Sequence, residues 1–430
     1  MKQLFLTLLL TLLPLGAAHA ESADDIWITL AQPAWQLLKQ SHPDLHSVSS
    51  RQVETGAEIK GKTSFDSVYL VQVSEPELEN LTQLVHEQLH HCAGFFAFDS
   101  REAAMASLHA STRGINLTRP SYNIEYQSTI EPMLAAMAAD NIRDTILGLT
   151  SFRNRYYNGQ YGADAANWLA DRWTALAATR SDVHVEKVFR GSDAMPSVVL
   201  TIDGLELAGQ VVVLGAHLDS VNVVDRGVTP HQDSIAPGAD DDASGVAGLT
   251  EILRQLMASD YQPQRTIKLM AYAGEEFGLY GSNYIATDYA NRNVDVVGVL
   301  QLDMTNYQGS VSDIYLINDY TDTLQNEFLE NLATTYLPSL SVAHTTCEYA
   351  CSDHASWNQQ GYAASFPFEA ILTQSNPAIH SSGDTYAGSG NQAANALKFT
   401  RLGMAYVVEL GELSGEHIYS DGFESKIGAP

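Results

Sequence analysis

Apolar and polar positions change their spacing in a regular way from about residue 128 onward. Short β-branched runs, typical of buried strands, alternate with segments whose apolar residues recur every three or four positions. Strands are expected at 183–189, 197–202, 210–218, 266–273, 296–304, 314–318 and 363–370, and helices at 129–150, 163–178, 243–259, 281–292, 322–336 and 391–412. This alternation predicts a three-layer α/β/α sandwich around a mostly parallel mixed sheet.

The chain before this domain follows a different pattern, which predicts a small α+β unit. The unit combines one helix with two strands, expected at 75–91, 67–74 and 95–98. Segment 113–127 has no helical period and contains Pro120, so we expect a linker where the chain is processed. The expected boundaries are 1–20 for a signal peptide, 21–118 for the α+β unit, 119–414 for the main domain and 415–430 for a polar tail.

The first twenty residues have the composition of an export signal. Lys2 is followed by the apolar run LFLTLLLTLLPLG, and Ala18-His19-Ala20 is a small-x-small cleavage site. We therefore expect a secreted, extracellular protein; an uncleaved membrane anchor is the alternative. No later run reaches eighteen consecutive apolar residues, so we expect no membrane contact after cleavage. The formal net charge of −28 argues against a nucleic-acid partner.

The three cysteines of the chain suit an oxidising compartment. Cys347 and Cys351 are separated by three residues, and we expect a disulfide between them, in a ring too short for much entropic stabilisation. Two free thiols are the alternative. Cys92 is then left over, as expected if it belongs to a segment that is removed later.

Side chains that bind divalent metals recur in order through the main domain. They lie in VVVLGAHLDS, PGADDDASG, LMAYAGEEFGLYGS, VLQLDMTNY and NPAIHSSGDT, and the residues are His217, Asp241, Glu275, Glu276, Asp303 and His380. The carboxyl ends of parallel strands bring such residues together. Two imidazoles and three carboxylates suit two divalent cations, with one carboxylate left over as a base. Asp219, two residues after His217, can orient that imidazole through its other nitrogen.

Two of these segments carry adjacent carboxylates. The triplet at 240–242 lies between glycines, where a metal would turn mutual repulsion into coordination; a solvated loop is the alternative. Glu275 and Glu276 directly follow a buried strand, so they need a cation or a raised pKa. Because neighbouring residues point in different directions, one can bind metal while the other faces the substrate.

One further motif competes with this set. Residues 86–90 read HEQLH, which matches the H-E-x-x-H pattern of zincins, with Glu87 as the base. The small unit around the motif offers little room for a cleft, and a zincin needs a third ligand. We therefore expect this segment to be the solvated face of a helix.

Six segments in this order, GAHLDS, PGADDDASG, AYAGEEFGLYGS, QLDMTNY, CEYACSDHASW and NPAIHSSGDT, resemble those of the two-zinc aminopeptidases of peptidase family M28. The resemblance is strongest to the secreted bacterial leucyl aminopeptidases of the Vibrio/Aeromonas type and covers about residues 120–412. It implies one α/β domain with an eight-stranded mixed sheet, made as a precursor. It also implies a secreted metallo-aminopeptidase that releases N-terminal, preferentially hydrophobic (Leu-like) residues from peptides.

The resemblance assigns the metal ligands residue by residue. Asp241 would bridge two Zn²⁺ ions. His217 and Asp303 would complete one site, and Glu276 and His380 the other.

It also assigns the catalytic groups. Glu275 would be the general base that takes a proton from the attacking water and delivers it to the leaving amine. Tyr349 would help to stabilise the tetrahedral oxyanion, and Asp219 would orient His217. The resemblance further implies a cis peptide bond between residues 241 and 242.

A substrate pocket is expected from apolar positions beside these motifs. The residues are Met304, Ile317, Phe366, Phe368 and Ile379. Core packing is the alternative for each. Leu372 and Ser375 stand where close relatives carry aromatic residues, which leaves the side-chain preference open.

Residues 21–118 are expected to be a propeptide that covers the active-site mouth, inhibits the enzyme as its zymogen, and aids its folding. A permanent accessory domain is the alternative. We expect a monomer that acts on peptides with a free N-terminus. For the main domain, the alternatives are a single-zinc acyltransferase of the glutaminyl cyclase type and a catalytically inactive binding ectodomain.

Overall fold

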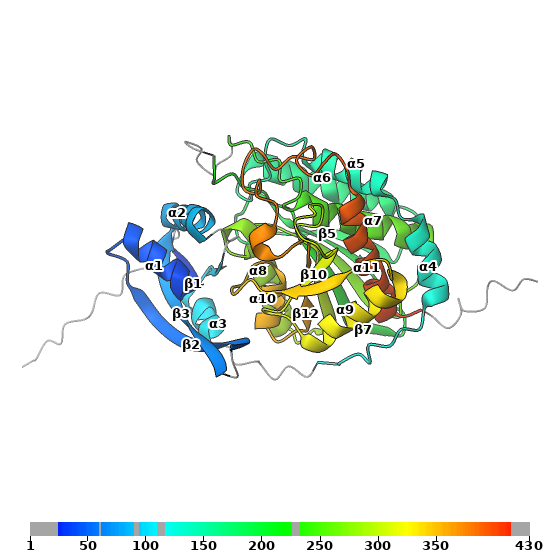
Figure 1. The fold of residues 1–430 in the computed structure, drawn as a ribbon, viewed down its shortest axis with the longest axis horizontal. Coiled ribbons are helices and arrows are strands. Elements are labelled where there is room, and N and C mark those ends of the chain that lie inside the picture. The colour runs from blue at the N-terminus through cyan, green and yellow to red at the C-terminus, as the bar shows by residue number, and fades with distance from the viewer. Residues whose placement is uncertain (1–24, 60–61, 90–93, 110–116, 226–232, 414–430) are drawn as a thin grey trace, which may run out of the picture.

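The computed structural model describes residues 25–59, 62–89, 94–109, 117–225 and 233–413. The expected signal peptide, the polar tail and Cys92 therefore lie outside the described residues. The described chain forms a small N-terminal unit beside a larger α/β domain (Figure 1). Among the described residues, no helix is both long enough and apolar enough to cross a membrane.

The N-terminal unit is a four-stranded antiparallel sheet with three α-helices. The strands follow the order β2-β3-β1-β4. The elements are β1 (Asp25–Ala31), α1 (Gln32–Ser41), β2 (Ser47–Ile59), β3 (Lys62–Ser74), α2 (Glu75–Leu84), the π-helical turn η1 (Val85–Leu89), β4 (Phe95–Phe98) and α3 (Arg101–His109). The sequence patterns missed β1, α1, β2 and α3. The reason for β2 is its composition, since SVSSRQVETGAEI is a polar edge strand without apolar alternation.

Helix α2 begins where the sequence predicts and ends earlier. Ser74 and Glu77 form a capping box, in which the Ser74 backbone N–H donates to the Glu77 carboxylate at 2.7 Å. The α-helix stops at Leu84 and continues as the π-helical turn η1. Turns of this kind are frequent at functional sites.

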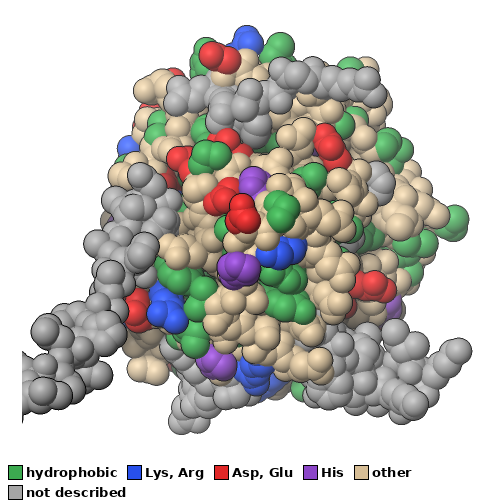
Figure 2. All heavy atoms as spheres, turned by 90° about the vertical axis from the view of Figure 1, so that its left-hand side faces the viewer, with side chains coloured by type: hydrophobic (Ala, Val, Ile, Leu, Met, Phe, Trp, Pro, Cys, Tyr) green, Lys and Arg blue, Asp and Glu red, His purple; other side chains and the backbone are tan. Residues whose placement is uncertain are grey.

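Figure 2 shows the end of the molecule that the N-terminal unit forms. Acidic, basic and histidine side chains are interspersed with apolar ones over this face. The opposite side of the unit packs against the α/β domain, where Val85 and Phe95 share one apolar cluster with Phe277.

The main domain is built on a six-stranded mixed sheet of order β12-β9-β7-β8-β6-β5. Neighbours β12/β9, β9/β7 and β7/β8 are parallel, whereas β8/β6 and β6/β5 are antiparallel. The strands are β5 (Val183–Val188), β6 (Ser197–Ile202), β7 (Leu207–His217), β8 (Arg265–Tyr272), β9 (Asp295–Gln301) and β12 (Ala364–Ser365). The expected mostly parallel mixed sheet is confirmed.

Helices cover both faces of this sheet, as expected for central strands that are buried on both faces. Val212 and Leu214 of β7 lie in the apolar cluster with one group of helices, while Val211 and Val213 lie in the cluster with the other. The first group is α4 (Gln127–Ala136), α5 (Ala139–Leu149), α6 (Gln160–Leu176), α7 (Ala243–Ala258), α9 (Thr323–Tyr336) and α11 (Ala394–Gly411), and the second is α8 (Tyr280–Asn291) and α10 (His354–Gln359). The result is the expected α/β/α sandwich.

Three expectations for this domain need correction. The single helix expected at 129–150 is two helices, α4 and α5, because the chain is extended at Met137 and Ala138. The strand expected at 363–370 changes sheets, with β12 in the main sheet and β13 (Pro367–Phe368) in a second one. That second sheet has the order β11-β10-β13, with β10 (Ile314–Ile317) and β11 (Val342–Thr345). The implied eight-stranded sheet is thus divided, among the described residues, into sheets of six and three strands.

Candidate metal centre

The candidate ligands lie at the carboxyl ends of three neighbouring parallel strands. His217 is the last residue of β7. Glu275 and Glu276 begin the short helix η2 (Glu275–Phe277), three residues after β8 ends. Asp303 follows β9 by two residues. This is the edge where parallel α/β sheets form their sites.

Four of the predicted side chains converge around the carboxylate of a fifth, Asp241. One of its oxygens lies 2.8 Å from Nε2 of His217, and the other lies 2.8 Å from Nε2 of His380. Asp303 approaches the first imidazole, with Oδ1 3.4 Å from Nε2 of His217. Glu276 approaches the second, with Oε2 3.2 Å from Nε2 of His380. The arrangement has two halves that share Asp241.

The donor atoms fit divalent cations. Several of them are buried and accept no hydrogen bond from any described residue: Asp241 Oδ2, both carboxylate oxygens of Glu275, Glu276 Oε2 and Asp303 Oδ1. Leaving so many buried carboxylate oxygens without a donor would cost several kcal/mol, which coordination of a cation removes. Nitrogen and carboxylate oxygen together are a donor set that suits zinc.

Asp242 lies close to the same atoms and has a different role. Its ligand oxygen is within 4.8 Å of those of His217 and Asp303. However, its two oxygens already accept backbone hydrogen bonds, from His217 N at 3.0 Å and from Gly245 N at 2.7 Å. The second bond caps the N-terminus of α7. Asp241 is therefore the better bridging candidate.

The loop that carries Asp241 is held by Asp384. The Asp384 carboxylate accepts the backbone N–H groups of Asp240 at 3.2 Å and Asp241 at 3.1 Å. The peptide bond between Asp241 and Asp242 is cis, as expected. All three carboxylates of the triplet are buried, so the alternative of a solvated loop is wrong.

Asp219 connects two parts of the site. Its oxygens accept the backbone N–H groups of Glu275 at 3.0 Å and Glu276 at 3.2 Å. The first of these oxygens also lies 3.5 Å from Nδ1 of His217. Asp219 thus fixes the turn that carries the paired glutamates and faces the back of the imidazole, as a partner behind a metal ligand does.

Burial and mutual repulsion shift the pKa values of this cluster. Burial raises the pKa of Glu275 well above its usual value, and raises that of Glu276 to about 7 despite the opposing effect of His380. Burial would also raise the pKa of Asp241, but His380 and His217 on either side hold it below its usual range. Burial alone would lower the pKa of His217, yet the neighbouring carboxylates, Asp303 first, raise it well above its usual value. These shifts describe a site with an excess of negative charge.

Sequence reasoning missed four buried groups around the ligands. Arg155 is fully buried and donates to the backbone carbonyls of Leu218, Pro237 and Gly238 at 2.5–2.9 Å. Asp353, Asp384 and Glu369 are buried carboxylates nearby. Two of these acids stand inside the quoted segments CEYACSDHASW and NPAIHSSGDT, which was a usable signal. Arg155, in an irregular stretch before α6, has no such signal.

The predicted pocket residues gather in one place. Met304, Ile317, Phe366 and Phe368 form a buried apolar cluster, against which Ile379 packs. Tyr349 belongs to the same cluster. The expected disulfide between Cys347 and Cys351 is present, with an S–S distance of 2.11 Å, and borders the cluster.

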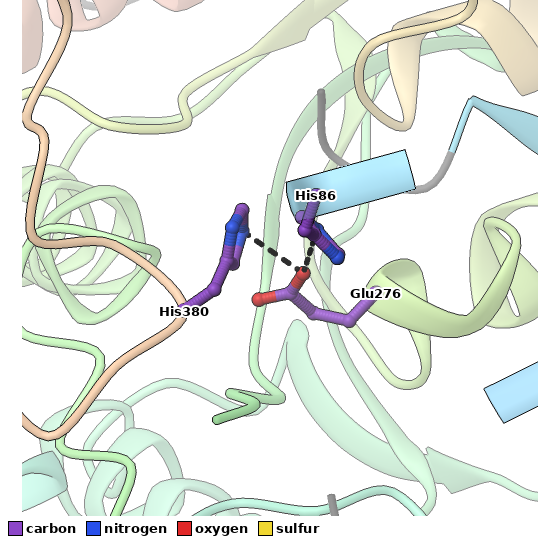
Figure 3. Close-up of side chains that lie close together, drawn as sticks. All are labelled: His86, Glu276 and His380. Carbon is purple, nitrogen blue, oxygen red and sulfur yellow. Dashed lines mark ion pairs between the residues drawn. The ribbon is translucent and has the colours of Figure 1, made fainter. Parts of the chain in front are cut away.

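His86 contradicts the expectation for the HEQLH segment. Its side chain is only 1% exposed, so this face of the helix is not solvated. Nε2 of His86 lies 3.7 Å from Oε2 of Glu276, and its ring centroid lies 3.9 Å from that of His380 (Figure 3). Glu87 is exposed and bonds to Gln83, so it does not act with His86 as the base of a zincin. His90 lies outside the described residues. Sequence reasoning found the motif and missed what it faces.

Comparisons with known proteins agree with this geometry. Residues 197–404 match the sequence description of Peptidase family M28. The chain is similar to leucine aminopeptidase 1 of Coccidioides posadasii, with 34% identity over 309 residues, which are 69% of this chain and 77% of that protein. It is also similar to the crystal structure of LapB from Legionella pneumophila, at TM-score 0.72 and 28% identity over 90% of this chain and 99% of that one. LapA aminopeptidase of Legionella pneumophila matches at TM-score 0.72 and 28% identity, over 91% of this chain and all of that one.

The chain belongs to peptidase family M28. It is a zinc-dependent aminopeptidase, a hydrolase that acts as a metallo-exopeptidase. Residues 119–430 make up less than three quarters of the chain, so the matches to LapA and LapB must take in part of the N-terminal unit as well. The resemblance to the Vibrio/Aeromonas type is not tested by these comparisons and stays a prediction.

Proposed function

We propose that this chain is the precursor of a secreted aminopeptidase that holds two zinc ions. The enzyme would release N-terminal residues from peptides, preferentially hydrophobic ones such as leucine. The observation that carries the proposal is the position of Asp241 between two histidines, with one carboxylate oxygen 2.8 Å from each Nε2. One carboxylate that faces two imidazoles from opposite sides suits a bridging ligand. Asp303 and Glu276 then complete one half each.

The ligands leave a separate residue for proton transfer. Two bound zinc ions would polarise the scissile carbonyl and lower the pKa of the attacking water. Glu275 stands beside both halves, and neither of its oxygens accepts a hydrogen bond from a described residue. We assign it the role of general base, which takes a proton on one carboxylate oxygen and returns it to the leaving amine.

Asp219 and Ser352 position these groups. Asp219 fixes the backbone of Glu275, as described above. The Ser352 hydroxyl donates to Oδ2 of Asp303 at 2.6 Å, which leaves Oδ1 turned toward His217. The base Glu275 and the ligand Asp303 are thus each oriented by a second contact, and support of this kind around a metal site maintains metal affinity.

The apolar cluster is the proposed pocket for the substrate's first side chain. Met304 follows the ligand Asp303 directly, and Ile379 precedes the ligand His380. An aliphatic side chain beside these residues would leave water and gain free energy in proportion to its buried area. Tyr349, held between the two disulfide-bonded cysteines, is the proposed oxyanion donor.

We further propose that residues 21 to about 118 are a propeptide. From residue 118 onward the linker is bonded to the main domain. Thr118 donates to the Asp295 carboxylate at 2.8 and 2.7 Å, and Arg119 pairs with Asp322 at 2.6 Å. Cleavage just before Thr118 would therefore leave these contacts of the main domain intact.

The propeptide would act at the turn that carries the glutamates. Ala97 of β4 donates its N–H to Gly278 O at 3.1 Å and accepts from Asn283 Nδ2 at 3.1 Å. A Cβ at Gly278 would lie 2.8 Å from the Phe95 ring, so this contact needs glycine. The unit packs directly on the segment after Glu275 and Glu276.

Aminoacyl-anilides test the function directly. Secreted protein that has been processed should hydrolyse leucine anilide faster than the alanine, glutamate and lysine anilides, and should ignore N-acetyl-leucine anilide, which lacks a free amine. A matched preparation of Glu275→Gln should be about 10²–10⁴-fold slower, while Glu186→Gln on the surface should behave as the unaltered protein. Activity on the acetylated substrate, or equal rates on all four anilides, would contradict the proposal.

A further inference from the structure

We infer that His86 of the N-terminal unit is itself a metal ligand, which closes the zinc position held by Glu276, Asp241 and His380 until the unit is removed. This inference rests on the proposed two-zinc function and names the atom through which the propeptide would inhibit. The HEQLH segment would then be neither the catalytic helix of a zincin nor a solvated helix, because it would carry an inhibitory metal ligand.

The ligand atoms of His86, Glu276 and His380 are spaced as the ligands of one zinc ion would be. His86 Nε2, Glu276 Oε2 and His380 belong to one group whose ligand atoms lie within 4.8 Å of one another. Two ligands at about 2.0–2.1 Å from a tetrahedral zinc are about 3.4 Å apart. The separations to Glu276 Oε2 are 3.7 Å from His86 and 3.2 Å from His380. Figure 3 shows both imidazoles turned toward the same Glu276 carboxylate, one from η1 and the other from the loop before α11.

The other ring nitrogen of His86 fixes the orientation of the imidazole. Nδ1 lies 2.7 Å from the backbone carbonyl oxygen of Thr82. A carbonyl only accepts, so Nδ1 carries the proton, and in the neutral ring the lone pair is on Nε2. A metal-binding histidine commonly donates its second ring N–H to a backbone carbonyl in this way. The ring is therefore oriented with the coordinating nitrogen toward Glu276.

The number of protein ligands at this zinc position would rise from three to four when His86 binds. Catalytic zinc keeps one position open for water or substrate beside three protein ligands, whereas structural zinc is closed by four. Asp241, Glu276 and His380 are three ligands. His86 would be the fourth, in the position that the free amine of a substrate needs. Coordination of His86 thus converts an open zinc site into a closed one.

The surrounding contacts hold His86 firmly enough for this role. Val85, next to it, is fully buried in the apolar core shared by the two parts of the molecule. Glu79 of α2 accepts a hydrogen bond from the Tyr156 hydroxyl at 3.4 Å. Asp99, just after β4, pairs with Arg190 of the main domain. The unit that carries His86 is thus held to the main domain by apolar packing, a hydrogen bond and an ion pair.

Cobalt substitution in the full, unprocessed chain tests the inference, since the visible absorption of cobalt depends on the number and kind of its ligands. His86→Ala should change the cobalt spectrum, release one of the two metals to a chelator at least about 10-fold faster, and raise the leucine anilide activity of the precursor. Glu87→Gln, an exposed neighbour on the same turn, should change none of these. Millimolar imidazole should restore the spectrum of His86→Ala.

X-ray absorption of the unaltered zinc-loaded chain tests the same inference without relying on the folding of a variant. Three imidazoles shared by two zinc ions support the inference, and two imidazoles overturn it. A His86→Ala spectrum and chelation rate identical to those of the unaltered chain also overturn it. These readouts do not use activity, so they separate this inference from the proposed function, which fails if the processed protein hydrolyses no aminoacyl-anilide.

Discussion

At the scale of single residues, the two adjacent glutamates have distinct environments. Oε2 of Glu276 lies 3.2 Å from Nε2 of His380, whereas neither carboxylate oxygen of Glu275 accepts a hydrogen bond from a described residue. The neighbouring positions therefore divide into a ligand and a base. This division is the finest distinction that the proposed mechanism makes.

The paired variants Glu275→Gln and Glu276→Gln should separate these roles. Glu275→Gln should retain two zinc ions and lose about 10²–10⁴-fold in kcat, because only the proton carrier is gone. Glu276→Gln should lose one zinc. Atomic absorption and anilide kinetics on the same samples measure both. If Glu275→Gln loses zinc while Glu276→Gln keeps both ions, the assignment is reversed.

At the scale of helices and strands, the ends of the parallel strands determine which side chains meet at the site. Strands β7, β8 and β9 could be predicted because each is a buried apolar run, and their parallel order brings His217, Glu276 and Asp303 to one edge. The strand at 363–370 could not be placed, since its change of sheets depends on neighbours far apart in the sequence. Arg155 was missed for the same reason, because it connects loops that only the folded chain brings together.

Arg155 gives a prediction at this scale. Arg155→Met should lower the free energy of unfolding by about 3 kcal/mol, since three buried carbonyls lose their donor and the buried acids lose a positive charge. It should also weaken zinc binding, because the loops at Leu218 and Gly238 flank two ligands. Arg292→Met is the control. Its exposed pair with Asp288 should contribute less than about 1 kcal/mol. Equal effects of the two variants in chemical denaturation would argue against the structural role of Arg155.

At the scale of the whole molecule, the residues of the candidate metal centre could largely be predicted from the sequence. The packing of the N-terminal unit over that centre could not. The candidate ligands, the disulfide and the α/β sandwich could be predicted from local sequence patterns. The position of His86 depends on how the N-terminal unit packs against the main domain, and the sequence contains no local signal for that packing. Glu87 and Gln88 on the same turn are exposed, as expected for a solvated face, whereas the face that carries His86 is buried.

Metal removal should make the stability of the protein depend on pH. Burial raises the pKa values of Glu276 and Asp353 to about 7 and of Asp384 to about 8. Between pH 6 and 8 the folded metal-free chain therefore binds more protons than the unfolded chain, so its stability falls as pH rises. The raised pKa of His217 acts in the same direction. His354, whose pKa burial lowers to about 3, opposes this only near and below its usual value of 6.5.

Thermal unfolding with and without a chelator measures this effect. The metal-free protein should have a lower Tm at pH 8 than at pH 6, and the rise in Tm on adding zinc should be larger at pH 8, where the ligands are already deprotonated. A metal-free protein that is more stable at pH 8 would contradict the proposed charge balance of the site.

The central claim is that Asp241 bridges two zinc ions, and anomalous X-ray diffraction at the zinc absorption edge of the zinc-loaded chain tests it most directly. The account predicts two anomalous peaks, one on either side of the Asp241 carboxylate, the first next to His217 and Asp303 and the second next to His380 and Glu276. A single peak, or two peaks that do not share Asp241 as a ligand, would contradict it.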